Sequence, residues 1–307
     1  MKIAVIGAGA MGSIFGGLLK ESGEDVTFID IYKEHMEEIA KNGLFLEMPD
    51  GTLKTIKGIK TAISPNGLPK MDLIIIFVKS TSTKEATYEA KELVSDNTLF
   101  LTLQNGLGNA ETIAEVVGKE KVLLGVTTCG GTFLSPGKIR FAGKGDTFIG
   151  GLKIKQERVK PIVDIFNHAG LPTFYREDVL GLVWDKLFVN VAINPVTAIT
   201  GLKNGELLNY EETKKVMKGL VEEAVYVAKK RGIERNAEEV YKHCLDVAKK
   251  TEKNISSMLQ DIIRGRKTEI DTINGKIVEY GRDLDIKTPY NEVITYLVKT
   301  LEKKGKS

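Results

Sequence analysis

The feature that most constrains the fold is a glycine-rich segment directly after the first apolar run of the chain. Lys2–Ile6 has the continuous apolar character of a buried strand, and residues 10–21 have the pattern of a helix. A Gly-x-Gly-x-x-Gly segment in this strand–helix context is typical of dinucleotide binding, whereas the bare motif is a weak signal. The segment consists of Gly7, Ala8, Gly9, Ala10, Met11 and Gly12.

Each glycine of this segment has a separate physical role in such a site. Gly7 permits the tight turn, Gly9 lets the backbone approach a pyrophosphate, and Gly12 lets the helix pack closely on the strand. Free N–H groups and the dipole at the helix N-terminus then favour the phosphate charge. A tight strand–helix turn that binds no ligand is the alternative.

Up to residue 177, short apolar runs alternate with helical stretches, which predicts βαβ units and a mostly parallel sheet. The run at 72–78 is apolar enough to be a central strand buried on both faces. The other expected strands are 25–29, 45–48, 53–56, 99–103, 122–127, 138–141, 147–149 and 172–175, and the expected helices are 32–41, 84–94, 109–117 and 156–169.

The pattern changes after Asp178, because no convincing strand follows and every periodic segment has helical spacing. At ~150 residues per domain, 307 residues suggest two domains. We therefore predict an α/β protein with an N-terminal Rossmann-type dinucleotide-binding domain (1–177) and an all-α C-terminal domain (178–307). The expected helices of the second domain are 179–200, 210–231, 237–249, 255–264, 267–284 and 291–303.

Composition excludes several other classes of protein. The chain has 44 Lys or Arg against 41 Asp or Glu, a net charge of +3, and 42% hydrophobic residues. This balance is too apolar for a disordered chain and offers no basic block for nucleic acid. The longest apolar runs, such as 73–78, fall short of the ~20 residues that span a bilayer, so we expect no membrane segment. Two scattered cysteines, Cys129 and Cys244, fit a reducing cytoplasm, and with three histidines they show no metal-ligand spacing.

An acidic residue, Asp30, ends the second expected strand, 30 − 7 = 23 residues past Gly7. A carboxylate there accepts hydrogen bonds from the adenosine ribose hydroxyls and repels a 2′-phosphate, which favours NAD(H) over NADP(H). Lys33 is close enough in sequence to weaken that preference. Asp30 also has the residue type of an N-cap for the helix expected at Tyr32, a role compatible with ribose binding.

Lys186, Asn190 and Asn194 follow one another at intervals of four residues within an otherwise apolar helix. They therefore share one helix face, and each needs a partner because burial of an unpaired polar group costs ~1–3 kcal/mol. Pro195 directly follows, so we expect Asn194 at a kink. These side chains could instead satisfy one another or cap other helices.

A second polar stretch lies further along the helical half. Ser257, Asp261 and Glu269 fall at 0, +4 and +12, which would place them on one broad face of a helix. A solvated polar face with Asn254 as N-cap is the alternative interpretation.

Taken in order, these segments resemble the ketopantoate reductase (2-dehydropantoate 2-reductase) family over essentially the whole chain. Single motifs are modestly specific, but the ordered set is highly specific. Besides the glycine-rich segment, the matching stretches are Val78-Lys79, Gln104-Asn105-Gly106, Trp184 to Lys186, Asn190, Asn194 to Ala198, Asn204 to Leu207, Asn254 to Asp261, Thr268 to Asp271 and Asn274-Gly275.

The resemblance implies an enzyme that reduces the 2-keto group of ketopantoate to pantoate, a step toward pantothenate and coenzyme A, with NADH or NADPH. It implies that Lys186 is the catalytic proton donor and that Glu269 lies near the nicotinamide ribose and the substrate hydroxyl. It also assigns substrate positioning to Asn190 and Asn194, contacts with the carboxylate end of the substrate to Asn204 and Ser257, and cofactor contacts to Lys79, Asn105 and Gly131, with Asn105 also reaching toward the substrate.

The sequence departs from the family at the residue after the second strand. Many members carry an arginine there, suited to the 2′-phosphate of NADPH, and this chain has Ile31. We therefore expect NADH to be used at least as well as NADPH. Coenzyme A shares the adenosine–pyrophosphate moiety with the dinucleotide, so competitive binding of coenzyme A is a further hypothesis.

The sequence is compatible with more than one activity, and its assembly is inferred from the resemblance alone. The family is often dimeric, and the helical half would form the interface. The alternatives are an oxidoreductase like the β-hydroxyacid dehydrogenases that acts on another small hydroxy or keto acid, or a catalytically silent dinucleotide sensor. Cys129 is either a redox-sensitive thiol near the nicotinamide or a small buried residue.

Overall fold

The computed structural model describes residues 1–304 and divides into two compact units. Unit 1 comprises Met1–Gln104 and Asn109–Leu182, and unit 2 comprises Asn105–Gly108 and the chain from Val183 onward. The chain thus enters unit 2 after Leu182, slightly beyond the expected boundary at 177. The four residues Asn105–Gly108, which fall in the expected first domain, belong to unit 2.

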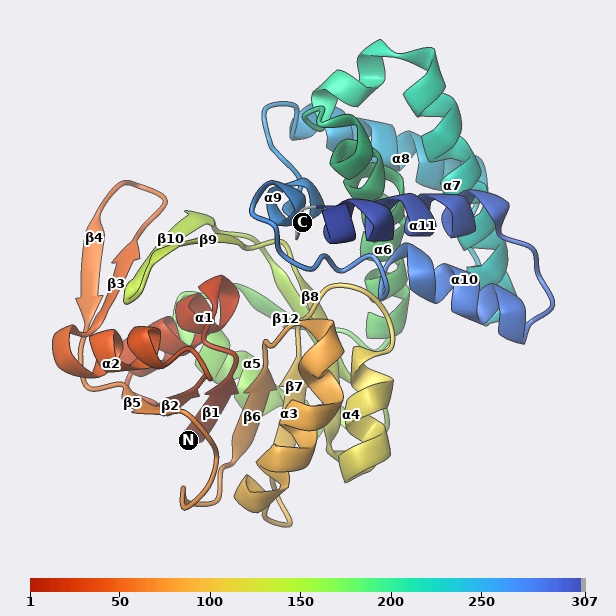
Figure 1. Ribbon diagram of the computed structural model, residues 1–307. Coiled ribbons are helices and arrows are strands. Elements are labelled where there is room, and N and C mark those ends of the chain that lie inside the picture. The colour runs from red at the N-terminus through yellow and green to blue at the C-terminus, as the bar shows by residue number, and fades with distance from the viewer. Residues whose placement is uncertain (305–307) are drawn as a thin grey trace. The chain divides into compact units, whose positions relative to one another are not determined.

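Unit 1 is built on an eight-stranded sheet with the order β12-β11-β8-β7-β6-β1-β2-β5. β6 is completely buried between β1 and β7, as its apolar sequence predicts, and β11 pairs antiparallel with β8 while the other neighbours run parallel. The mostly parallel sheet is therefore confirmed (Figure 1). Its strands are β1 (Lys2–Ile6), β2 (Asp25–Ile29), β5 (Lys60–Ala62), β6 (Leu73–Ile76), β7 (Leu99–Thr102), β8 (Val122–Thr127), β11 (Thr147–Gly151) and β12 (Thr173–Tyr175).

Helices cover this sheet, and α1 (Ala10–Glu21) is enclosed most tightly. A Cβ on Gly16 would lie 2.3 Å from the Phe28 ring of β2, and one on Gly17 would lie 2.7 Å from Leu44 of the second sheet. Two adjacent glycines therefore let α1 fit between two sheets. Phe15 of α1 also contacts Phe166 of α5, at 5.8 Å between ring centroids. The other helices of the unit are α2 (Lys33–Asn42), α3 (Thr83–Glu89), α4 (Asn109–Val117) and α5 (Gln156–His168), with 3₁₀ segments η1 (Ser80–Ser82), η2 (Ala90–Leu93) and η3 (Lys119–Lys121).

The second sheet of unit 1 has four strands in the order β4-β3-β10-β9 and lies over α1 (Figure 1). β5 and β9 are not predicted from the sequence, because β5 has three residues and β9 begins with Gly130 and Gly131, which supply no apolar alternation. The strands of this sheet are β3 (Leu44–Glu47), β4 (Leu53–Ile56), β9 (Gly130–Ser135) and β10 (Lys138–Gly143).

From Val179 to Lys304 the structure contains helices and no strand, as expected. The α6 helix brings Trp184, Leu187, Phe188 and Val191 into the apolar core of unit 2, where all four are at most 2% exposed. The elements are α6 (Val179–Thr200), η4 (Gly205–Asn209), α7 (Glu211–Lys230), α8 (Ala237–Lys250), α9 (Ser257–Ile263), α10 (Asn274–Asp283) and α11 (Pro289–Lys304).

The expected helix at 267–284 is wrong over its first seven residues, because α10 begins only at Asn274. Thr268 and Thr272 direct their hydroxyls to local groups: the Thr272 hydroxyl donates to the Glu269 carbonyl at 3.2 Å, and the Ile270 N–H donates to the Thr268 hydroxyl at 3.1 Å. Such bonds compete with helix formation. Glu269 therefore lies in a turn and cannot share a helix face with Ser257.

The N-cap expectation for the preceding helix is also corrected. α9 begins at Ser257, and the hydroxyl of Ser256 accepts the Leu259 N–H at 3.1 Å, so Ser256 and not Asn254 is the N-cap. The Asn254 carbonyl instead accepts the Asn204 N–H at 3.0 Å.

α6 is the one candidate membrane span among residues 1–304, by length and composition alone. Of its most apolar window, 61% is buried inside the structure, and the core helix of a globular protein passes the same test. The length of uninterrupted apolar runs does not identify this helix, because Asp185 and Lys186 interrupt it.

His35 is a buried histidine that joins three parts of unit 1. Its Nε2 lies 2.8 Å from the Ala8 carbonyl of the glycine-rich segment, and its Nδ1 accepts the Gly137 N–H from the β9–β10 turn at 2.8 Å. Nδ1 must be unprotonated to accept, so the ring is neutral with its proton on Nε2. Burial lowers the pKa of His35 below 6.5, against the smaller opposing effects of the Ala8 carbonyl and Asp30.

This pKa shift predicts a pH dependence of stability. Because the unfolded state binds the proton more readily, the contribution of His35 is complete above about pH 6.5 and is lost as the pH falls below that value. We expect His35→Leu to lower the free energy of unfolding at pH 8 by about 1–3 kcal/mol, since the Gly137 N–H loses its partner. The variant should also depend less on pH between 7.5 and 5.5, measured by urea unfolding.

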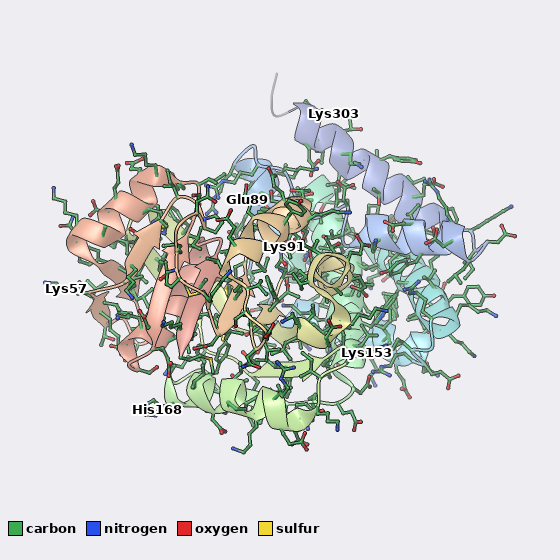
Figure 2. The ribbon with its side chains drawn as sticks, turned by 90° about the horizontal axis from the view of Figure 1, so that it is seen from below. Lys57, Glu89, Lys91, Lys153, His168 and Lys303 are labelled. Atoms are coloured by element: carbon green, nitrogen blue, oxygen red, sulfur yellow. The ribbon has the colours of Figure 1, made fainter. Side chains whose placement is uncertain are left out.

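His168→Gln is the matched control, because His168 is exposed at the end of α5 and points outward in Figure 2. It should leave both the stability and its pH profile unchanged. A His35→Leu profile as steep as that of the unaltered chain would contradict the assignment.

Candidate functional site

The glycine-rich segment forms the turn between β1 and α1 with the geometry that a phosphate site requires. Gly7 has φ +94°, and a Cβ there would lie 2.5 Å from the Val78 nitrogen, while one on Gly12 would lie 2.0 Å from the Gly7 carbonyl oxygen. A Cβ on Gly9 would meet nothing within 4 Å, and no side chain caps α1. The segment thus leaves open space at a helix N-terminus, and it fits the pyrophosphate of a dinucleotide.

Asp30 follows β2 and binds the same segment. Its Oδ2 accepts the Ala8 N–H at 2.7 Å, and its Oδ1 accepts the Tyr32 N–H at 2.8 Å. The N-cap of α2 is Tyr32, so the expected N-cap role of Asp30 is wrong, although its carboxylate does bind a backbone N–H at this helix entry. Ile31, the next residue after Asp30, is 92% exposed. The Lys33 ammonium lies 3.5 Å from Glu37.

Two other predicted cofactor residues of unit 1 lie close to the glycine-rich segment. Lys79 is the next residue after Val78, whose backbone nitrogen packs against Gly7. Gly131 of β9 faces the start of α1, where a Cβ would lie 2.4 Å from Ile14 and 3.4 Å from the Met11 sulfur. The structure therefore brings Gly7–Gly12, Asp30, Gly131 and the Lys79 segment together within unit 1.

In unit 2, α6 carries Lys186, Asn190 and Asn194 on successive turns, as the spacing predicts. Lys186 and Asn190 are half-buried, and Asn194 is 9% exposed. The helix continues through Pro195 to Thr200. Next to Lys186, both oxygens of Asp185 accept from the Arg235 guanidinium, at 2.7 and 3.0 Å. This paired hydrogen bond fixes the rotation of α6 near Lys186.

The loop Asn105–Gly108 docks on the turn that carries Glu269. The Leu107 N–H donates to the Thr272 carbonyl at 3.0 Å, and Gly106, with φ +85°, approaches Thr272 too closely for any Cβ. The Asn105 side-chain amide then donates to a Glu269 carboxylate oxygen at 3.3 Å. Two residues 164 positions apart in sequence thus form one polar pair.

The start of α9 is joined to α6 through two hydroxyls. The Thr197 hydroxyl lies 2.6 Å from that of Ser256 and also donates to the Asn194 carbonyl at 2.8 Å. Ser257, the predicted substrate contact, follows Ser256 and is exposed. The structure therefore holds the segment of Ser257 close to Asn194.

Asn204, a predicted substrate contact, is buried. Its Nδ2 donates to the Thr251 hydroxyl at 2.9 Å, and its buried Oδ1 has no hydrogen-bond partner. An amide oxygen does not attract a carboxylate, so a contact with the substrate carboxylate would use the second N–H of Nδ2.

Both cysteine thiols donate to backbone carbonyls. The Cys129 thiol donates to the Gly145 carbonyl at 3.2 Å, and burial raises the pKa of Cys244 to about 12. Within residues 1–304, no group of three or more His, Cys, Asp or Glu side chains could hold a metal ion.

Comparison with known proteins relates both halves of the chain to one family. The family profile described as "Ketopantoate reductase PanE/ApbA" matches residues 3–153, and the profile described as "Ketopantoate reductase PanE/ApbA C terminal" matches residues 178–302. A protein of Pyrococcus horikoshii named 2-dehydropantoate 2-reductase is 40% identical over 306 residues, which cover 99% of each chain. One of the same name from Halobacterium salinarum is 35% identical over 99% of this chain and 100% of that protein.

Solved structures give the same fold over the full length. D-mandelate dehydrogenase in a ternary structure with NADH and anilino(oxo)acetate aligns with a TM-score of 0.94 and 30% identity, covering 100% of both chains. A PanE/ApbA family ketopantoate reductase from Ralstonia eutropha aligns with a TM-score of 0.92 and 32% identity, also covering 100% of both chains. With both profiles matched in order and full-length relatives at this identity, the chain belongs to the ketopantoate reductase family.

Proposed function

We propose that this protein is an NAD(P)H-dependent oxidoreductase that reduces 2-dehydropantoate, a 2-keto acid, to pantoate. The observation that carries the proposal is the pairing of Asn105 with Glu269 in the unit whose helix α6 presents Lys186, Asn190 and Asn194. The full-length relatives named 2-dehydropantoate 2-reductase support the substrate. The open glycine-rich segment supports the dinucleotide.

Each side chain has a distinct task in this reaction. Bound nicotinamide supplies the hydride to the 2-keto carbon, which leaves negative charge on the carbonyl oxygen. The Lys186 ammonium stabilises that charge and gives the oxygen its proton, so that a hydroxyl forms. Asn190 and Asn194 offer amide donors to the substrate, and Glu269, oriented by Asn105, accepts a hydrogen bond from a hydroxyl.

A second candidate is a reductase for a 2-keto acid with an aromatic group. The full-length likeness to D-mandelate dehydrogenase bound to anilino(oxo)acetate favours it. The same side chains would serve either substrate, because both carry a carboxylate beside a 2-keto group. A catalytically silent dinucleotide sensor would require neither Lys186 nor Glu269, and the chain has both.

We expect oxidation of NADH or NADPH, followed at 340 nm, to be fastest with ketopantoate in a panel of branched, straight and aromatic 2-keto acids. Lys186→Ala should lower kcat by ~10²-fold or more, because it removes the proton donor and its charge. Dinucleotide binding, measured by fluorescence titration, should stay unchanged, since Gly7–Gly12 lie in unit 1. A fully active Lys186→Ala enzyme would contradict the mechanism, and a preference for aromatic acids would favour the second candidate.

The cofactor preference is a finer proposal that rests on Asp30 and Ile31. The Asp30 carboxylate is held at the end of β2 by two backbone N–H groups, and its oxygens retain lone pairs for the ribose hydroxyls. Its charge opposes a 2′-phosphate. We therefore propose that NADH is used at least as well as NADPH.

Measurement of kcat/KM with both dinucleotides tests this preference. Ile31→Arg should raise the kcat/KM ratio of NADPH to NADH by about tenfold, because a guanidinium can bind the 2′-phosphate. Ile31→Gln is the uncharged control and should not change the ratio. A tenfold preference of the unaltered enzyme for NADPH would refute the proposal. Ile31 is suited to the test because its side chain is almost wholly exposed.

Competition by coenzyme A and assembly as a homodimer are two further proposals. Coenzyme A would place its adenosine–pyrophosphate moiety on Gly7–Gly12, so its inhibition should weaken as NADH is raised. Its 3′-phosphate is opposed by Asp30, so we expect a weak inhibitor. The absence of inhibition at millimolar coenzyme A would refute this proposal.

Assembly as a homodimer is a separate proposal, and light scattering would measure the oligomeric state.

A further inference from the structure

A proline inside α6 leaves one backbone carbonyl without its usual helical donor. In an α-helix the carbonyl of residue 191 accepts the N–H of residue 195, and Pro195 has no N–H. The Asn274 side chain supplies the missing donor: its Nδ2 lies 3.2 Å from the Val191 carbonyl oxygen. Asn274 is the first residue of α10, so this bond joins the start of one helix to the middle of another.

The bond joins two groups of predicted site residues. On α6, Val191 follows Asn190 and precedes Asn194 by three residues. On the other side, Asn274 ends the turn that carries Glu269, whose carbonyl accepts the N–H groups of Thr272 and Ile273, both at 3.1 Å. This contact therefore links the turn that carries Glu269 to the part of α6 that carries the two amides.

Other residues of the turn are bound to α11. Both the N–H and the hydroxyl of Thr268 donate to Glu302, at 2.7 and 2.6 Å. Asp271 pairs with Lys299 at 2.6 Å and with Lys267 at 3.5 Å. Burial alone would raise the pKa of Asp271, but these ammonium groups hold it below its ordinary value. The Asn274 side chain bonds directly to α6 at the Val191 carbonyl.

The Asn274 amide has a single possible orientation in this network. Its second N–H donates to the Asn291 side-chain oxygen at 3.0 Å, and the Asn291 amide donates to the Leu220 carbonyl and to Glu223. A flipped Asn274 would turn its oxygen toward two acceptors. Both asparagines are 0% exposed, and the Asn274 oxygen has no partner.

From this geometry we propose that Asn274 is a positioning residue for the reductase reaction. Its hydrogen bond to the Val191 carbonyl, which Pro195 leaves without a helical donor, fixes the position of Glu269 relative to Asn190 and Asn194. The inference rests on the proposed 2-keto acid reduction. It assigns Asn274 no contact with substrate or cofactor.

Four variants distinguish a positioning role of Asn274 from a role that only gives the Val191 carbonyl a hydrogen-bond donor. Asn274→Ala removes the link, whereas Pro195→Ala restores a helical N–H for Val191. The double variant Asn274→Ala/Pro195→Ala satisfies the carbonyl but lacks the link. Asn236→Ala is the matched stability control, because it removes the N-cap of α8, where the Asn236 oxygen accepts from Glu238 and Glu239 at 2.9 and 3.1 Å.

Three measurements are made on each full-length variant: urea unfolding, steady-state kinetics with ketopantoate, and emission of Trp184. Trp184 is the only tryptophan of the chain, and its ring lies 6.3 Å from that of Tyr280 on α10. Its emission therefore reports the packing of α6 on α10 without any need for activity. NADH affinity provides a control for unit 1.

We expect Asn274→Ala to lower kcat/KM for ketopantoate by about tenfold or more, since small misplacements of catalytic groups have such effects. NADH affinity should change less than twofold, and Trp184 emission should shift. The double variant should regain urea resistance yet keep the low kcat/KM, while Asn236→Ala loses stability with normal kinetics.

Two results would overturn the proposal. Recovery of kcat/KM in the double variant to within twofold of the unaltered enzyme would mean that Asn274 only satisfies a carbonyl. Unchanged Trp184 emission in Asn274→Ala would mean that the link positions nothing, whatever the activity. Failure of the proposed function is a separate outcome, in which the unaltered enzyme reduces no 2-keto acid.

Discussion

Unit 1 depends on the peptide group of Ala8. Its N–H donates to Asp30 at 2.7 Å, and its carbonyl accepts from His35 at 2.8 Å and from the Ser13 hydroxyl at 2.7 Å. Because these side chains come from α1, from α2 and from the residue after β2, the glycine-rich segment is fixed in place by the fold itself, and a ligand need not order it. Asp30 therefore has two roles: it binds the backbone of the glycine-rich segment, and it is the proposed acceptor for the ribose hydroxyls. A substitution of Asp30 would disturb both roles, whereas Ile31 can change its chemistry without breaking any of these bonds.

Unit 2 uses side chains in the same way to bring together residues that are far apart in sequence. Four segments contribute, around Asn105, Lys186–Asn194, Ser257 and Glu269. Asn105 reaches Glu269 only because Gly106 lets its loop lie against Thr272, and Ser257 is held toward Asn194 because Ser256 and Thr197 share a hydrogen bond. Each link uses a hydroxyl or amide to join two elements, so the local sequence around any one of these residues does not reveal it.

This explains which parts of the structure the sequence could predict. The parallel sheet, the glycine-rich turn and the polar face of α6 follow from short-range patterns: apolar runs, a spaced glycine motif and a four-residue interval. The turn at Thr268–Ile273 is predicted as helix because Ile270, Ile273 and Ile277 fall at i, i+3 and i+7, the spacing of one helix face. Only the hydroxyl bonds of Thr268 and Thr272 show otherwise. β9 does not show in the sequence because Gly130 and Gly131 carry no apolar pattern, and the reason that position 131 is glycine, its close approach to α1, is a tertiary fact. Asn274 belongs to one of the motifs that match the family, but the motif does not show which groups the Asn274 side chain binds.

The pairing of Pro195 with Asn274 is not the arrangement that stability alone would select. A non-proline residue at 195 would satisfy the Val191 carbonyl within the helix, and no side-chain donor would then be needed. The present pair instead breaks a helical hydrogen bond, repairs it with a buried amide, and leaves the Asn274 oxygen unpaired at a cost of about 1–3 kcal/mol. A backbone bond inside α6 would fix only α6, whereas the amide bond also fixes the start of α10 and, with it, the turn of Glu269. Local rules are typically broken where a fold serves function, and here the break yields a directional link between two groups of candidate catalytic residues.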